Sequence, residues 1–105
     1  MADFDERKRG YESKFAHDEE LRFRALSRGN KLLGLWAAEQ LGKSGDEAEA
    51  YAQEVTRMGF GAGSEGVIGK LVYDLGPRAE EATIRSQMEA ALAEAAEQVA
   101  NAQGS

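Results

Sequence analysis

The sequence predicts an all-α protein, and three observations support that fold class. Alanine and glutamate are abundant and there is a single proline, a composition that favours helices. Only four valines, two isoleucines and two threonines are present, too few β-branched residues for a sheet-based core. Apolar residues recur at spacings of three and four. We therefore expect a small four-helix bundle, residues 18–105, that carries a mobile, charged N-terminal arm, residues 1–17.

The first expected helix runs from about Asp18 to Leu41 and contains the densest apolar cluster of the chain. Gly42 supplies a natural C-terminal stop. A broad apolar face suited to helix packing consists of Leu21, Ala25, Leu26, Leu32, Leu33, Trp36 and Ala37. Trp36, the only tryptophan, is expected to anchor the core.

The second expected helix follows a capping-box pattern. In this pattern the Ser44 side chain accepts a hydrogen bond from the amide of Glu47, and the Glu47 side chain reaches back to the amide of Ser44. The glycines of the segment 59–63 are expected to end this helix in a loop.

The third and fourth expected helices complete the bundle. Ser64 is expected to cap the third helix, and Gly76 followed by Pro77 stops it. The fourth begins between residues 78 and 83 and ends near Ala102. Its alanine-rich stripe allows close approach to neighbouring helices, and the short connections favour a four-helix bundle.

The expected arm differs from the rest of the chain because it is almost entirely charged. Phe4, Tyr11 and Phe15 are separated by seven and four residues, so they would share one face of a helix. Three aromatic rings on a short charged segment are too few to fold it alone. The arm is therefore predicted to become ordered on a partner, as a helix bound in a groove.

The charge balance restricts the class of partner. The formal net charge is −6 and the pI is about 4.8, which argues against nucleic acid and against an anionic membrane surface. Cysteine is absent, which removes thiolate catalysis and cysteine-based metal sites. No signal peptide or membrane-spanning run is recognisable, so we expect a cytoplasmic protein that does not insert into the membrane.

Few residues suggest chemistry, and we expect no enzyme, no metal site and no cofactor. The glycine cluster of residues 59–66 lacks the preceding strand and terminal lysine of a phosphate-binding loop. Lys70 lies in the helix that follows it, which leaves weak adenine-nucleotide binding as an alternative. The bases Arg22, Arg24, Arg28 and Lys31 suit an anion but more often form surface ion pairs.

His17, the only histidine, lies beside Asp18, Glu19 and Glu20. In that setting a histidine is usually a solvated surface residue. The neighbouring carboxylates would favour its protonated form, so the alternative is a pH-responsive hinge between the arm and the body.

One long segment resembles the zeta subunit of bacterial F-type ATP synthases. The run from Asn30 to Leu41, NKLLGLWAAEQL, is long and specific. The upstream residues that match are Lys14, Phe15, Ala16, His17, Asp18, Glu19, Glu20, Leu21 and Phe23. The resemblance is strong over about the first half of the chain; the second half agrees in helix layout more than in residues.

The resemblance implies a four-helix inhibitor of ATP hydrolysis, bound to the catalytic head of the synthase and thereby held at the inner membrane. In that family the N-terminal segment enters a catalytic interface between alpha and beta subunits; gamma is a further candidate partner. The arm residues expected to contact the partner are Phe4, Arg7, Tyr11, Glu12, Lys14 and Phe15. A nucleotide-sensing bundle and a helical adaptor for an unrelated partner are the alternatives.

Two departures from the family pattern stand out. Gly29 lies where a second arginine is expected, and residues 59–66 are rich in glycine where acidic residues are usual. We expect Gly29 to weaken a contact on the helix surface. The glycine-rich segment is expected to loosen the second and third helices.

Overall fold

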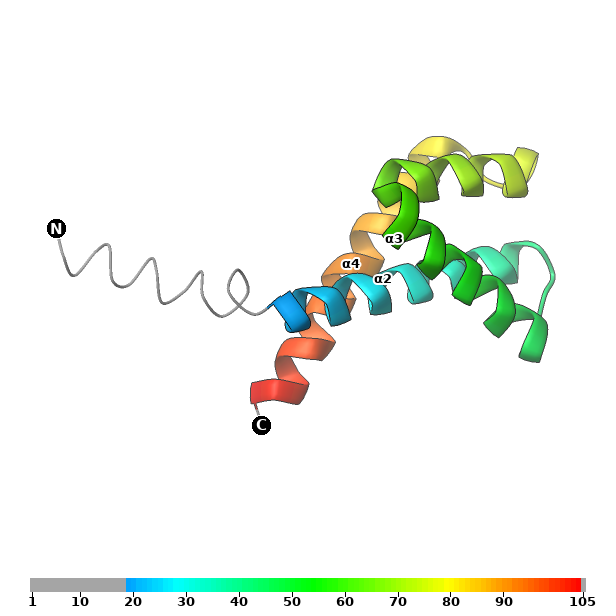
Figure 1. The fold of residues 1–105 in the computed structure, drawn as a ribbon. Coiled ribbons are helices and arrows are strands. Elements are labelled where there is room, and N and C mark those ends of the chain that lie inside the picture. The colour runs from blue at the N-terminus through cyan, green and yellow to red at the C-terminus, as the bar shows by residue number, and fades with distance from the viewer. Residues whose placement is uncertain (1–18, 105) are drawn as a thin grey trace, which may run out of the picture.

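The structure, a computed structural model, describes residues 19–104, and this part of the chain is almost entirely helical. The elements are α2 (Glu19–Gln40), α3 (Gly45–Leu75), the 3-10 turn η1 (Gly76–Arg78) and α4 (Glu81–Gly104) (Figure 1). The all-α fold class is confirmed, but the expectation of four helices is wrong, because the described residues form three. The expected arm lies outside the described residues. None of the helices in this part of the chain combines the length and apolar composition needed to span a bilayer.

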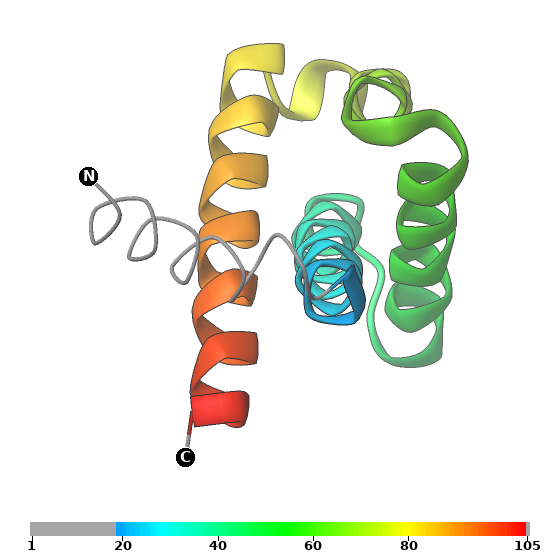
Figure 2. The ribbon, with the colours of Figure 1, turned by 60° about the vertical axis from the view of Figure 1, so that its left-hand side comes forward.

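The second and third expected helices follow each other directly in α3 and meet at a kink at Gly63. The glycine-rich segment does not form the expected loop. Only Gly63 leaves the helical conformation, with φ 74° and ψ −172°, and there α3 changes direction (Figures 1 and 2). Helical glycines cost about 1 kcal/mol each, yet Gly59 has a packing role. A Cβ atom there would collide with the side-chain amide of Asn30 in α2, which would have to move.

The beginning of α3 was placed correctly, but the hydrogen bond that was expected to cap it is absent. Ser44 is the N-cap residue with an extended backbone, and its side chain makes no capping hydrogen bond. Gly45, the first helical residue, has φ 58°, a left-handed conformation outside the capping-box geometry. At the other end, Gly76 has φ 55° and donates its N–H to the carbonyl of Val72.

The helix α2 occupies the centre of the fold, with α4 on one side and the first half of α3 on the other (Figure 2). Two glycines allow these close approaches. A Cβ at Gly34 would lie 2.7 Å from the Cα of Ala52 in α3, and one at Gly29 would lie 2.5 Å from Cδ2 of Leu92 in α4. Gly29 is thus buried at a helix crossing, rather than weakening a surface contact as expected.

The hydrophobic core combines residues from all three helices. Its buried members are Leu33, Ala37, Ala38, Tyr51, Val55, Val67, Ile68, Leu71, Leu75, Ile84, Met88 and Ala91. Leu33 and Ala37 belong to the apolar face that was expected for the first helix. Trp36 is only partly buried and packs against this core, so the expectation that it anchors the core was too strong.

A polar cluster joins the two halves of α3. The Tyr51 hydroxyl, in the first half, donates to Oδ2 of Asp74 in the second half at 2.7 Å. Nζ of Lys70 lies 3.0 Å from the same carboxylate and 3.6 Å from Oε2 of Glu54. Burial and the hydrogen bond to Asp74 raise the pKa of Tyr51. Burial alone would raise the pKa of Asp74, but the hydrogen bonds from Tyr51 and Lys70 outweigh it and lower that pKa.

A second link joins α3 to α4 across the surface. The guanidinium of Arg85 in α4 makes two hydrogen bonds to Glu65 in α3, of 2.9 and 2.8 Å, and one to Glu81. The hydrogen bonds from Arg85 lower the pKa of the Glu65 carboxyl. Because the groups are exposed, we regard this link as a weak orienting contact.

Candidate functional site

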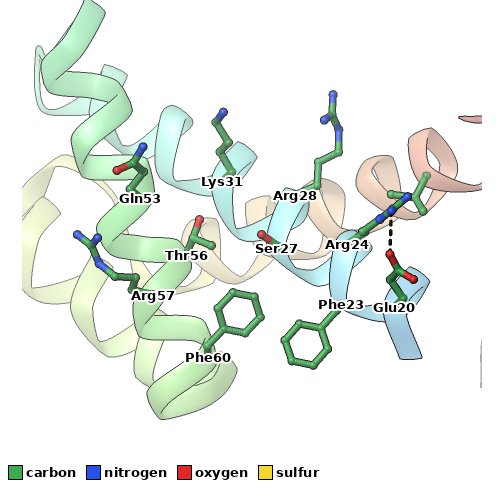
Figure 3. Close-up of a pocket in the computed structure, with 11 residues that line it drawn as sticks. Glu20, Phe23, Arg24, Ser27, Arg28, Lys31, Gln53, Thr56, Arg57 and Phe60 are labelled. Carbon is green, nitrogen blue, oxygen red and sulfur yellow. Dashed lines mark hydrogen bonds and ion pairs between the residues drawn. The ribbon is translucent and has the colours of Figure 1, made fainter. Parts of the chain in front are cut away.

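A groove of about 790 Å³ lies between α2 and the first half of α3, and we refer to it as the α2–α3 groove (Figure 3). It is lined by Glu20, Phe23, Arg24, Ser27, Arg28, Lys31, Gln53, Thr56, Arg57, Phe60 and Val99. All but Val99 come from α2 and α3, which run side by side here. Aromatic and basic side chains make up more than half of this lining, a combination that the core does not use.

Two phenylalanine rings form the apolar part of the groove. Phe23 of α2 and Phe60 of α3 stack with their ring centroids 5.1 Å apart and an angle of 19° between the ring planes (Figure 3). Phe23 is 59% exposed and Phe60 is 45% exposed. The rings therefore contact each other without being covered by the rest of the described protein, and they leave apolar area open to solvent.

Basic side chains surround the aromatic pair, and their interactions within the chain are weak. Arg24 pairs with Glu20 at 2.9 Å and Lys31 pairs with Glu49 at 3.5 Å; in both pairs the side chains are half or more exposed. Arg28 donates its Nε–H to Gln98 of α4. Arg57 forms no ion pair with any residue that the structure describes.

This combination suits a partner that is both acidic and apolar. Exposed ion pairs contribute about 0–1 kcal/mol each, so an incoming carboxylate can replace the internal partner at little cost. Arginine forms bidentate hydrogen bonds with carboxylates, and the exposed rings offer apolar contact area. The groove can therefore bind anionic groups beside an apolar side chain. No reaction is suggested by its geometry.

The residues singled out from the sequence fall into two groups. The arm residues and His17 lie outside the described residues, so their roles stay predictions. Of the four bases considered for an anion, Arg24, Arg28 and Lys31 line the groove, whereas Arg22 faces a smaller adjacent hollow with Glu19 and Leu26. Lys70 is not in the groove; its ammonium group belongs to the polar cluster of α3.

Sequence reasoning missed Phe60 and Arg57, and gave Phe23 no role beyond the family resemblance. Phe23 lies off the apolar stripe predicted for its helix, and a large aromatic residue outside such a stripe is the signal that could have identified it. Phe60 was assigned to a loop. Its pairing with Phe23 depends on the helix continuing through the glycines, which a single sequence does not reveal.

No metal site is visible in the described part of the chain. Among residues 19–104 there is no group of three or more histidine, cysteine, aspartate or glutamate side chains arranged to hold a metal ion.

Comparisons with known proteins agree with this architecture. A protein whose solution structure was determined by NMR is 48% identical in sequence and superposes with a TM-score of 0.71; the match covers 77% of this chain and 96% of that one. No curated protein matches the chain. The sequence profile of the ATPase inhibitor subunit zeta family matches residues 1–98, which include both the expected arm and nearly all of the helical body. The chain therefore belongs to the ATPase inhibitor subunit zeta family.

Proposed function

We propose that this protein inhibits ATP hydrolysis by F-type ATP synthase through two contacts. Residues 1–17 enter a catalytic interface between alpha and beta subunits of the catalytic head. The helical body, residues 18–105, docks on the same head and holds the arm in place. The observation that carries this proposal is the family match over residues 1–98, because it covers the arm and the body together.

The chemistry of the arm supports its assignment to the inhibitory contact. Phe4, Tyr11 and Phe15 provide an apolar face if the segment becomes helical, and Arg7 and Lys14 provide charges that can pair with acidic groups beside it. Glu12 can pair with a basic group of the partner.

Burying three aromatic rings returns about 1.5–3 kcal/mol each. Ordering some fifteen residues costs about 1–2 kcal/mol of backbone entropy per residue. The arm alone therefore binds weakly, and a second contact through the body is needed.

The effect of a docked body is to raise the effective concentration of the arm at its site. On this proposal a synthetic peptide of residues 1–20 inhibits far more weakly than the intact chain. No cofactor is required for this action, because both contacts are between proteins.

Steady-state ATP hydrolysis by the cognate catalytic head tests the proposal. The intact chain should suppress hydrolysis, and a variant lacking residues 1–17 should not. Circular dichroism of the shortened variant provides the control that the helical body is still folded. Equal inhibition by both proteins would contradict the assignment of inhibition to the arm.

A second candidate function, adenine-nucleotide sensing, is favoured by one observation: the groove places aromatic rings beside basic groups. Phe23 and Phe60 already stack on each other, so a base has only the outer face of a ring available. Titration with ATP, ADP and inorganic phosphate, followed by NMR shifts of groove residues, separates the two functions. Larger shifts with the nucleotides than with phosphate would support the sensor.

A further inference from the structure

We infer that the α2–α3 groove is the surface by which the body docks, and that its partner is an acidic protein segment carrying an exposed apolar side chain. This inference rests on the proposed function, because the partner is taken to be the catalytic head. It adds the surface on this chain and the chemistry that the surface recognises.

The apolar half of the inference comes from the Phe23–Phe60 stack. Both rings remain about half exposed although they contact each other, and neither belongs to the hydrophobic core. Aromatic side chains with this exposure are typical anchors of protein interfaces, where an apolar partner group removes them from water. An apolar side chain placed against the stack would cover the area that the fold leaves open.

The acidic half comes from charge complementarity. The whole chain carries a net charge of −6, yet the groove is lined by four bases, Arg24, Arg28, Lys31 and Arg57, and by a single acid, Glu20. The side chains that line the groove therefore carry a formal net charge of +3. A positive surface on a negative protein attracts and orients an acidic partner and repels a second copy approaching with its basic face.

The place of the groove along the chain favours a role in docking the arm. The groove includes Glu20, Phe23 and Arg24, from the first two turns of α2, so it lies close to the residue at which the arm joins the body. A partner bound there would hold the first residues of α2 and so restrict where the arm can reach. This is the geometry that a high effective concentration requires.

Binding of full-length variants to the cognate catalytic head tests this inference. Phe60→Ala removes half of the aromatic stack. Arg57→Glu reverses a groove cation that forms no ion pair with any described residue. Tyr73→Ala and Arg78→Glu are the matched controls: Tyr73 is 87% exposed, and neither lines the groove. Melting curves verify that all four variants are folded.

We expect each groove variant to weaken binding by roughly tenfold or more, since interface anchors contribute more than 1 kcal/mol and 1.4 kcal/mol corresponds to tenfold. The controls should stay within about twofold of the parent. Arg57→Glu should also reduce the salt dependence of binding, whereas Phe60→Ala should not. Groove variants that bind as tightly as the controls would overturn the inference.

Hydrolysis measurements separate a failure of this inference from a failure of the proposed function. At saturating concentration the groove variants should still inhibit as fully as the parent, because their arm is intact. If the unmodified protein binds through the groove but does not inhibit, the proposed function is contradicted while the assignment of the docking surface still holds. If sedimentation shows a dimer that Arg57→Glu dissociates, the groove is occupied by a second copy and the inference is wrong.

Discussion

Within residues 19–104, two places combine aromatic rings with basic groups, and they differ in what remains available to a partner. In the polar cluster of α3, Nζ of Lys70 lies 5.1 Å from the centroid of the Tyr51 ring and pairs with Asp74 and Glu54. Tyr51 is 7% exposed. In the α2–α3 groove, the rings of Phe23 and Phe60 and the nearby bases stay exposed. In the polar cluster these groups bind one another and stabilise the fold, whereas in the groove they remain exposed and available to a partner.

The difference has a structural origin. The polar cluster spans the bend at Gly63, so Tyr51 on one side and Lys70 and Asp74 on the other can satisfy each other within the chain. The groove lies where α2 and the first half of α3 run side by side, and its basic side chains come mostly from one helix. Bases that share a helix face cannot neutralise one another. Their acidic partners are Glu20, one turn before Arg24 in α2, and Glu49 of α3, and both pairs are exposed and weak.

Among the predicted changes in stability, the largest is expected at Leu71, which follows Lys70 in α3 and is fully buried. Leu71→Ala should lower the free energy of unfolding by about 2–5 kcal/mol through lost burial and a residual cavity. The adjacent Val72→Ala is the control, because Val72 is 38% exposed, and it should cost less than about 1 kcal/mol. Urea unfolding measures both. Equal losses would mean that the second half of α3 is not packed as described.

A pair of glycines tests the close contact between α2 and α3. At Gly34 an added Cβ would lie 2.7 Å from the Cα of Ala52, whereas at Gly69 nothing lies within 4 Å. Gly34→Ala should destabilise the protein by about 1–2 kcal/mol, because overpacking exceeds the gain in helix propensity. Gly69→Ala should stabilise it by about 0.5–1 kcal/mol. Thermal unfolding reports both, and effects of the same sign would contradict the close approach.

The polar cluster itself is tested by Tyr51→Phe, which removes only the hydroxyl that donates to Asp74. We expect a loss of about 1–2 kcal/mol near pH 7, because the acceptor is a carboxylate that keeps Lys70 as a partner. Tyr73→Phe, at an exposed site, should have little effect. Chemical denaturation of the three proteins gives the comparison.

The free energy of unfolding of Tyr51→Phe should depend less on pH in the acid range than that of the parent. The pKa of Asp74 is lowered in the folded protein, so its contribution is complete above the unfolded pKa of about 3.9 and is lost as pH falls through the lower folded value. The difference in unfolding free energy between the parent and Tyr51→Phe should therefore shrink below about pH 4. A difference that stays constant down to pH 2 would show that the hydroxyl does not act through the Asp74 carboxylate.

The smallest effect on stability is expected in the groove. Phe60→Ala should cost about 1 kcal/mol or less, because the ring is 45% exposed and stacks on a second exposed ring, that of Phe23. The substitution should weaken binding to the catalytic head and change the melting temperature little. A loss as large as that of Leu71→Ala would place Phe60 in the core and remove the contrast between the two regions.

Local patterns were sufficient to predict the all-α fold class and the apolar faces that supply much of the core. Leu33, Val55, Leu71 and Ile84 all fall on apolar stripes of helical spacing, and all are buried. These features depend on periodicity, which a sequence displays directly.

The path of α3 through the glycines and the α2–α3 groove could not be predicted, because both depend on contacts between helices. Glycines 59–63 signal a break, but Gly59 stays helical and lies against Asn30, and only Gly63 leaves the helical conformation. The same continuity brings Phe60 to Phe23 and creates the groove. The resemblance to the zeta family, by contrast, was visible in residues 14–41, and the match over residues 1–98 confirmed it.

Competition between the body and the intact chain tests the central claim, that inhibition needs an arm and a separately docked body. ATP hydrolysis by the cognate catalytic head is first suppressed with a fixed amount of intact protein, and increasing amounts of residues 18–105 are then added. We predict that hydrolysis recovers as the body displaces the intact chain without inhibiting. Hydrolysis that stays suppressed at a large excess of the body would show that the arm binds unaided and would contradict the two-contact account.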